Sequence, residues 1–311
     1  MNKLLRITYL FIAIVILIFI STLSYAQITI LYPKERPLQA YHKFWLKKLL
    51  DKKVEIEYHQ NSNKTTYIIL KATKASLKSK KSKHKAKVDN DIIVLLHGKN
   101  GRKEDLLPLC ERYLAMGFVC ILPDLPAHGD SKLSKFKVDN NYLDNILDDA
   151  SKYIDFKDKK IAIWGFSLGS AVAVKCVAHS KYRFNAMVLV STFDKLKSVV
   201  EEKTSQFLGG FLAKEFDLAL YSSLKSFWNF DIESLDSQKY AKKLNIPVLI
   251  IHGQKDNIVN YKRAEALYKS FASSKKEFLL NPNSNHNTIL NEVLKDYSKN
   301  SEFLIEELNS I

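Results

Sequence analysis

The run Gly165-Phe166-Ser167-Leu168-Gly169 has the spacing G-x-S-x-G, which is typical of a nucleophilic serine. It directly follows the apolar segment 160–165 and directly precedes a stretch of small, helix-forming residues. A serine in this context is predicted to lie on a tight strand-to-helix turn, where its hydroxyl faces the substrate. Glycines on both sides leave room for the bent backbone. Ser167 is therefore the predicted nucleophile.

A serine hydroxyl is a weak nucleophile at neutral pH and needs a neighbouring base. His286 lies in a polar loop, after the last predicted strand and before the final predicted helix, where nothing structural requires an imidazole. His179 ends a predicted helix and His252 ends a predicted strand beside a glycine, so both fit less well. The other histidines that we considered lie upstream of the predicted catalytic region: His42, His59 and His84. We expect His286 to be the base.

A catalytic histidine is usually oriented by a carboxylate. Asp256 follows the predicted strand 247–252 through Gly253-Gln254-Lys255, which places it at the carboxyl end of that strand. Asp194 follows the preceding predicted strand and is the alternative. We expect Asp256 to orient His286.

The negative charge that develops on the substrate during acyl transfer needs two backbone donors. One is expected to be the N–H of Leu168, directly after the nucleophile. The turn His97-Gly98-Lys99-Asn100-Gly101 follows a buried strand, and the N–H of Lys99 is the expected second donor. We expect His97 to stabilise this turn and not to transfer protons.

The elements that must position these residues alternate between apolar strands and helices. Predicted strands cover 54–58, 65–71, 91–97, 118–123, 160–165, 184–190, 247–252 and 277–280, and predicted helices cover 38–50, 103–116, 141–156, 168–179 and 287–308. Continuous apolar strands separated by helices indicate an α/β fold, with a mostly parallel central sheet and helices on both faces. The aromatic-rich interval 192–245 is too long for a simple connection, and we expect a helical cap insertion there.

The ordered motifs resemble those of the α/β-hydrolase superfamily, within it the branch of monoglyceride lipases and serine-aminopeptidase-like (S33) hydrolases. The resemblance rests on the motifs already described and on the run 124–131, which matches D-x-P-G-H-G-x-S except that Ala127 replaces a glycine. It extends from Asp91 to the C-terminus. The chain order Ser, Asp, His is the one these enzymes use.

The resemblance implies the α/β-hydrolase fold and an acyl-enzyme mechanism that needs no cofactor. The expected activity is hydrolysis of carboxylic esters, including lipid-derived acyl esters. Aminopeptidase-like and thioesterase activities on the same fold are the alternatives, since the fold does not determine the substrate. A non-catalytic protein that binds at a membrane surface is the alternative from another class.

The formal net charge of +15 is unevenly distributed. Lys71 to Lys87 contains eight lysines and no acidic residue, and is predicted to be a basic loop. No aromatic residue interleaves with these lysines, which argues against nucleic acid as the partner. A solvated loop is the simpler interpretation, and attraction to an anionic membrane surface is the functional one.

The first 26 residues have the layout of a targeting segment. Lys3 and Arg6 precede a long apolar run, and Ser24-Tyr25-Ala26 suits cleavage before Gln27. The uncharged stretch is also long enough for a retained membrane anchor. Both interpretations place the hydrolase domain, residues 27–311, outside the cytoplasm, either exported or anchored.

The three cysteines give no sign of a disulfide framework or a metal site. Each lies in an apolar context and their spacing matches no metal-binding pattern: Cys110, Cys120 and Cys176. We expect all three to be buried and no metal to be required.

Overall fold

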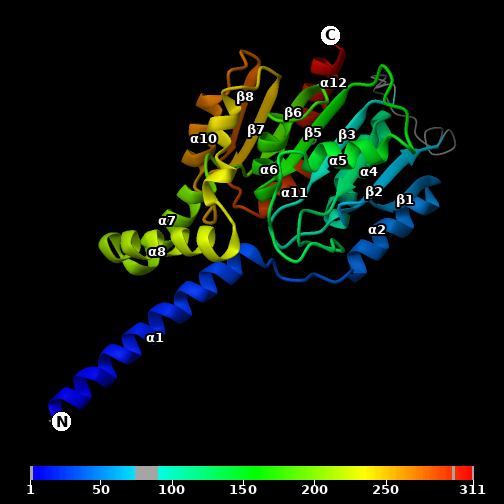
Figure 1. Ribbon diagram of the computed structural model, residues 1–311. Helices are drawn as coiled ribbons and strands as arrows, with labels where there is room; N and C mark the ends of the chain where they lie inside the picture. Colours follow the sequence, from blue (N-terminus) through cyan, green and yellow to red (C-terminus); the bar gives the residue numbers. More distant parts are fainter. Residues whose placement is uncertain (1–2, 74–89, 296–297, 310–311) are drawn as a thin grey trace.

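The computed structural model describes residues 3–73, 90–295 and 298–309 (Figure 1). Within these ranges the strands form one eight-stranded sheet with the spatial order β1-β2-β4-β3-β5-β6-β7-β8. The strands run over Val54–Gln60 (β1), Thr66–Ala72 (β2), Ile92–Leu96 (β3), Val119–Pro123 (β4), Ile161–Phe166 (β5), Phe184–Val190 (β6), Val248–Gly253 (β7) and Lys276–Asn281 (β8).

The pairing of the strands confirms the predicted, mostly parallel sheet. β2 pairs antiparallel with β1 and with β4, whereas the strands from β4 through β3 to β8 pair in parallel. The carboxyl ends of β3, β5, β6, β7 and β8 therefore meet at one edge of the sheet. In open α/β sheets this edge carries the functional site.

Alternate strand residues pack into two separate apolar layers. Ile92 and Val94 of β3 join one buried cluster, while Ile93 and Leu95 join the other. Because the side chains on both faces of such a strand are buried, its sequence is a continuous run of apolar residues. The elements between the strands, apart from the cap, are Ala40–Asp51 (α2), Lys103–Leu106 (η1), Leu107–Met116 (α4), Tyr142–Ala150 (α5), Leu168–Val177 (α6), Tyr261–Ser270 (α10), Thr288–Lys295 (α11) and Ser298–Asn309 (α12).

The two layers of helices cover opposite faces of the sheet. Residues of α5, α6 and α10 belong to the first cluster, and residues of α2, α4, α11 and α12 to the second. All three cysteines are free and buried, as expected: Cys110, Cys120 and Cys176.

The interval between β6 and β7 contains the helices Leu196–Leu208 (α7), Gly210–Trp228 (α8), Ile232–Leu235 (η2) and Ser237–Ala241 (α9). α7 and α8 form a hairpin that projects from the body of the molecule (Figure 1). Phe216, Leu220 and Leu224 of α8 are buried in the first apolar cluster, so one face of the hairpin is part of the core.

The N-terminal helix α1 spans Lys3–Leu31 without a break at Ala26. Residues 5–31 are long and apolar enough to cross a membrane. The outer part of α1 extends away from the body, whereas its last turns contact α8 (Figure 1). Leu31 is completely buried, and the partly buried side chains Leu23, Ala26 and Ile30 pack against the same core.

Three elements differ from the sequence expectation. The single helix expected over 287–308 is described as the two helices α11 and α12. The helix expected over 141–156 ends at Ala150, where the N–H groups of Tyr153 and Ile154 both donate to the Ala150 carbonyl and turn the chain away. Helix α10 was not predicted, although its first residues carry a signal: the side chain of Asn260 accepts a hydrogen bond from the N–H of Lys262, as an N-cap does.

Most of the basic segment predicted at 71–87 lies outside the described residues. Its flanks are described: β2 ends at Ala72 and β3 begins at Ile92. β3 runs parallel to β5, so its first residue lies at the edge of the sheet opposite Ser167. Attraction of this segment to an anionic surface stays a prediction.

Candidate active site

Ser167 occupies the sharp turn between β5 and α6. Its backbone has φ 50° and ψ −116°, a strained conformation for a residue with a side chain. The turn is held because the N–H of Ser167 donates to the Val190 carbonyl at 2.8 Å and the N–H of Ser170 donates to the Ser167 carbonyl at 3.0 Å. The strain places the Ser167 hydroxyl at the carboxyl edge of the sheet.

The structure brings Ser167, His286 and Asp256 into one hydrogen-bonded row. The Ser167 Oγ lies 3.0 Å from Nε2 of His286, and Nδ1 of His286 lies 2.7 Å from Oδ2 of Asp256. All three residues are less than a tenth exposed. The row is assembled from the carboxyl ends of β5, β7 and β8, and β6 lies between β5 and β7 in the parallel sheet.

Both carboxylate oxygens of Asp256 have hydrogen-bonding partners in the protein. Its Oδ1 accepts hydrogen bonds from the N–H groups of Ile258 and Val259, at 2.9 and 2.8 Å. Its Oδ2 faces His286 and also lies 3.2 Å from Nε2 of His252. Burial alone would raise the pKa of the Asp256 carboxyl, but the hydrogen bonds from His252 and His286 hold that pKa well below its usual range. Asp256 therefore stays ionised beside His286.

His252 is a neighbour of the site that sequence reasoning did not assign. We expected it only to order a loop, and its Nε2 does lie 3.0 Å from the Val259 carbonyl. The additional contact with Asp256 makes its ring a second hydrogen-bond donor to the carboxylate. The spacing of four residues between His252 and Asp256 across a turn was the available signal.

Asp194, the alternative carboxylate, lies in a different arrangement. Its Oδ2 is 3.5 Å from Nη1 of Arg263, and its Oδ1 accepts the N–H of Lys195. Burial raises the pKa of the Asp194 carboxyl. The His286 ring is bonded to Asp256 and not to Asp194.

The two expected oxyanion donors flank Ser167. A side-chain carbon added at Gly98 would lie 3.4 Å from the Cβ of Ser167, so the turn that carries Lys99 lies directly beside Ser167. In the described part of the chain, the N–H groups of Lys99 and Leu168 donate to no protein acceptor. Leu168 begins α6, where the helix dipole adds partial positive charge. This turn and this helix end can accept a developing negative charge.

His97 ties the turn to the neighbouring strand. Its Nδ1 donates to the Gly98 carbonyl at 2.8 Å, and its Nε2 accepts the N–H of Leu125 at 3.0 Å. Burial lowers the pKa of the His97 imidazole, and burial lowers that of the adjacent His128 to about 3. Both rings are neutral and hold the backbone, as we expected for His97.

Gly169 keeps the nucleophile close to this turn. An added Cβ would lie only 2.4 Å from the His97 carbonyl oxygen and 2.5 Å from that of Leu96. We expect Gly169→Ala to lower the free energy of unfolding by about 1–3 kcal/mol and to lower ester turnover, because α6 must move away from the turn. Urea unfolding and turnover measure both effects. The control is Gly210→Ala, where an added Cβ meets nothing within 4 Å. Unfolding at the same urea concentration as the wild type would contradict the prediction.

The run 124–131 forms a buried ionic cluster beneath the turn. Lys103 Nζ lies 2.6 Å from Oδ2 of Asp124, which also accepts the Thr66 hydroxyl at 2.7 Å. Gly129 has φ 54°, and a Cβ there would lie 2.0 Å from Asp124. This cluster fixes the end of β4 against the residues that follow the turn.

Ala127, where the family pattern has glycine, carries backbone strain. Its φ is 62°, in the left-handed region that disfavours a residue with a Cβ. We expect Ala127→Gly to raise the free energy of unfolding by roughly 0.5–1 kcal/mol, the relief of strain less the added freedom of the unfolded chain. The control is Ala266→Gly in α10, which should lower stability by about the same amount. Urea unfolding decides, and a loss of stability in Ala127→Gly would refute the argument.

The segment between α1 and α2 is fastened to the same turn. The N–H of Lys34 donates to the side chain of Asn100 at 2.9 Å, and Nη1 of Arg102 donates to the Arg36 carbonyl at 2.9 Å. Arg36 also forms an ion pair with Asp105 at 3.0 Å. The N-terminal helix and the turn with Lys99 are therefore parts of one bonded structure.

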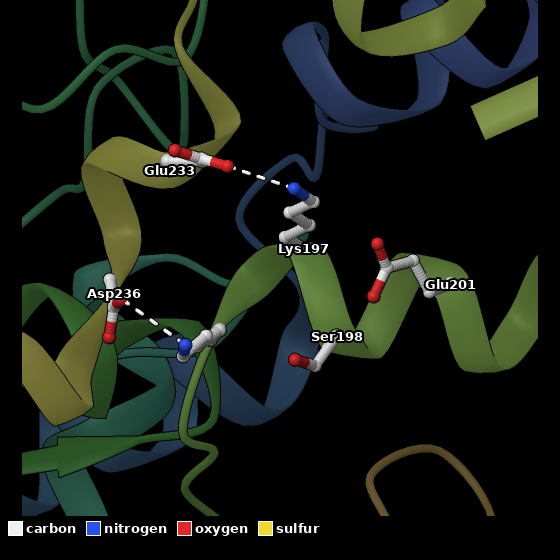
Figure 2. Close-up of a pocket in the computed structure, with 6 residues that line it drawn as sticks. Lys197, Ser198, Glu201, Glu233 and Asp236 are labelled. Atoms are coloured by element: carbon white, nitrogen blue, oxygen red, sulfur yellow. Dashed lines mark hydrogen bonds and ion pairs between the residues drawn. The ribbon is translucent and has the colours of Figure 1, made fainter. Parts of the chain in front are cut away.

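A cavity of about 350 Å³ lies at the base of the cap, and Figure 2 shows the residues that line it. Its lining is charged, and four of the five charged side chains form two ion pairs: Lys197 lies 2.8 Å from Glu233, and Lys195 lies 3.6 Å from Asp236, while Glu201 is the fifth. No residue of the Ser167 row lines it. The described residues contain no group of three or more metal-ligating side chains placed to hold a metal ion.

Comparisons with known proteins agree with this fold. A model of the α/β-hydrolase fold matches residues 91–231, and a model of the serine aminopeptidase (S33) family matches residues 232–293. Protein bem46 of Schizosaccharomyces pombe is 32% identical over 128 residues, which are 41% of this chain and only 38% of that protein. The matched part thus spans well under half of that relative.

Solved structures share the fold at low sequence identity. An esterase from Pyrococcus furiosus is 17% identical with a TM-score of 0.63, covering 89% of this chain and 99% of that one. A putative lipase from Acinetobacter baumannii is 17% identical with a TM-score of 0.55, covering 89% and 99%. The sheet order, the turn at Ser167 and the two consecutive family matches lead to the same result: the chain belongs to the α/β-hydrolase superfamily.

Proposed function

We propose that the chain is a serine hydrolase that cleaves carboxylic esters through an acyl-enzyme on Ser167. The observation that carries this proposal is the hydrogen-bonded row from Ser167 through His286 to Asp256. A buried hydroxyl bonded to an imidazole, which is itself bonded to an ionised carboxylate, is the arrangement that activates serine.

In the proposed mechanism, Nε2 of His286 takes the proton from Ser167 as its Oγ attacks the acyl carbon. Asp256 accepts the Nδ1–H of His286 and stabilises the imidazolium that forms. The N–H groups of Leu168 and Lys99 stabilise the negative charge on the former carbonyl oxygen. His286 then gives its proton to the leaving alcohol, and a water molecule activated by the same ring releases the acid.

Esters are the preferred substrate class for two reasons. The similar solved structures include an esterase and a putative lipase, and the cap carries large apolar side chains such as Phe207 and Phe211. Aminopeptidase-like and thioesterase activities are the alternatives on the same site. A non-catalytic role is less well supported, because nothing interrupts the Ser167 row.

Reaction with a fluorophosphonate probe, followed by a substrate panel, tests the proposal. The full chain should be labelled at Ser167 and should hydrolyse acyl esters faster than aminoacyl amides or acyl thioesters. Faster cleavage of aminoacyl amides would establish the peptidase alternative instead. Absence of both labelling and turnover would support the non-catalytic role.

We further propose that α1 is retained as a membrane anchor with the hydrolase domain outside the cytoplasm. The contacts of α1 with the body lie on both sides of Ala26: Leu23 packs on the core, and Gln27 Nε2 lies 2.6 Å from the Ser223 hydroxyl. Cleavage before Gln27 would divide a continuous helix and remove part of this packing. An exported, cleaved form is the alternative.

A further inference from the structure

The outer face of the cap hairpin carries large apolar side chains that no part of the described chain covers. The exposed fractions are 84% for Phe207, 77% for Phe211, 63% for Leu212 and 67% for Leu218. Phe207 and Phe211 flank Gly209 and Gly210, so the tip of the hairpin is an uncharged apolar turn. Clustered exposure of this kind marks an interaction surface.

Helix α1 packs beside α8 of the hairpin. Phe19 of α1 packs edge-to-face on Phe216 of α8 with ring centroids 5.8 Å apart. Near the other end of the contact, Trp228 Nε1 lies 3.3 Å from Gln27 Oε1 and its ring packs on Tyr32 at 5.9 Å. α8 therefore runs along the last turns of α1, in the same direction.

This register sets the depth of the cap in a bilayer crossed by α1. The uncharged run of α1 begins after Arg6, and a span of about 20 residues from there reaches about Ala26. Phe19 lies seven residues short of Ala26, which is about 10 Å inside the hydrocarbon boundary. Phe216 is at the level of Phe19, so the N-terminal half of α8 lies within the outer part of the bilayer.

The polar residues of the hairpin fit an interfacial depth. Lys214 and Glu215 are exposed near the tip, and long charged side chains can reach the headgroups from an interfacial helix. Trp228 and Tyr32 lie beyond Ala26, at the boundary level where aromatic side chains concentrate. An interfacial helix typically inserts its apolar face by about 5–10 Å.

The α7–α8 hairpin is also hydrogen-bonded to the loop that carries Asp256. Lys203 of α7 donates to the Asn257 carbonyl at 2.7 Å, next to Asp256. Ile258, on the same loop, is 49% exposed. The apolar cap and the mouth of the site are therefore adjacent, and both lie at the carboxyl edge of the sheet.

We propose that the outer face of the α7–α8 hairpin docks in the lipid bilayer and that the substrate is a long-chain ester resident in that bilayer. The substrate part rests on the proposed ester hydrolase function, whereas the docking part does not. In Figure 1, α1 and the hairpin extend from the same side of the body, while α2 lies on the other side.

Spin labels on the full chain in vesicles of phosphatidylethanolamine and phosphatidylglycerol test the docking surface. The native cysteines are buried, so single variants Phe207→Cys and Phe211→Cys can be labelled selectively. Both labels should collide more with oxygen, which concentrates in hydrocarbon, than with a water-soluble nickel complex. The control is Phe44→Cys on α2, 61% exposed, which should show the reverse.

Three results would overturn the docking proposal. One is nickel collisions at Phe207 and Phe211 equal to those at Phe44 in protein that unfolds at the wild-type temperature. Another is strong dipolar coupling between labels at Phe211 on two chains, which would mean that a second copy covers this face. The third is an intact mass without residues 1–26, because the contact of Phe19 would then be absent.

A pair of activities tests the substrate. The double variant Phe207→Ser, Phe211→Ser should lose at least about ten-fold in kcat/KM on a long-chain ester embedded in the vesicles, since two anchoring side chains are removed. Hydrolysis of soluble p-nitrophenyl acetate should not change, and Phe44→Ser should change neither activity. Equal loss on both esters would overturn the bilayer substrate. Inactivity of the wild type on both esters would refute the proposed function while the spin labels still decide the docking.

Discussion

Ser167→Ala is expected to abolish ester hydrolysis and fluorophosphonate labelling, with a fall in kcat on the order of 10⁴ to 10⁶. The substitution removes only the Oγ that lies 3.0 Å from Nε2 of His286. The backbone strain at φ 50° is unchanged, because alanine has the same Cβ as serine. The fold should therefore survive, and the activity should not.

The measurement is steady-state turnover of a short activated ester, with thermal unfolding to confirm the fold. Ser198→Ala on α7 is the control, since Ser198 lines the charged cavity and has no part in the Ser167 row. It should retain wild-type turnover. More than a few per cent of activity in folded Ser167→Ala would show that another group is the nucleophile.

Asp256→Asn is expected to lower kcat by about 10⁴-fold. The asparagine oxygen can still accept the N–H groups of Ile258 and Val259. Its amide nitrogen then faces Nδ1 of His286, where a donor now stands in place of an acceptor. The ring must present the wrong tautomer to Ser167, and it loses the negative charge that stabilises its cation.

Asp194→Asn is the matched substitution, and we expect it to change kcat far less. It weakens only the contact with Arg263, a side chain that is one-third exposed. Comparison of kcat for the two folded variants on one soluble ester decides between the carboxylates. A larger loss in Asp194→Asn would move the orienting role to the end of β6.

The residues of the candidate site were predictable because their signals are local. Ser167 follows a strand buried on both faces, and such a strand is visible as an uninterrupted apolar run. Asp256 follows the equally buried strand β7, whereas His286 follows the partly exposed edge strand β8. Parallel strands bring their carboxyl ends together whatever the length of chain between them. Pattern and topology were therefore enough to place three distant residues at one edge.

Other features depend on contacts between distant segments and left no local pattern. The bonds of Lys34 and Arg36 to the turn with Lys99 join segments more than sixty residues apart. The packing of α1 on α8 likewise cannot be predicted from either segment alone, because the apolar side chains of each helix do not identify their packing partner.

The packing of α1 against the body fixes the orientation of the catalytic domain relative to this helix. Gln27 is bonded to α8, Leu31 is completely buried and Arg36 is bonded to Arg102 and Asp105, so the described chain has no slack between the span and the catalytic domain. In the proposed anchored form, a domain held in this way samples fewer orientations above the membrane surface than a domain joined to its anchor by a flexible linker. In this anchored form, encounters with the proposed bilayer ester become a two-dimensional search, governed by the number of ester molecules per unit area of the leaflet and by lateral diffusion.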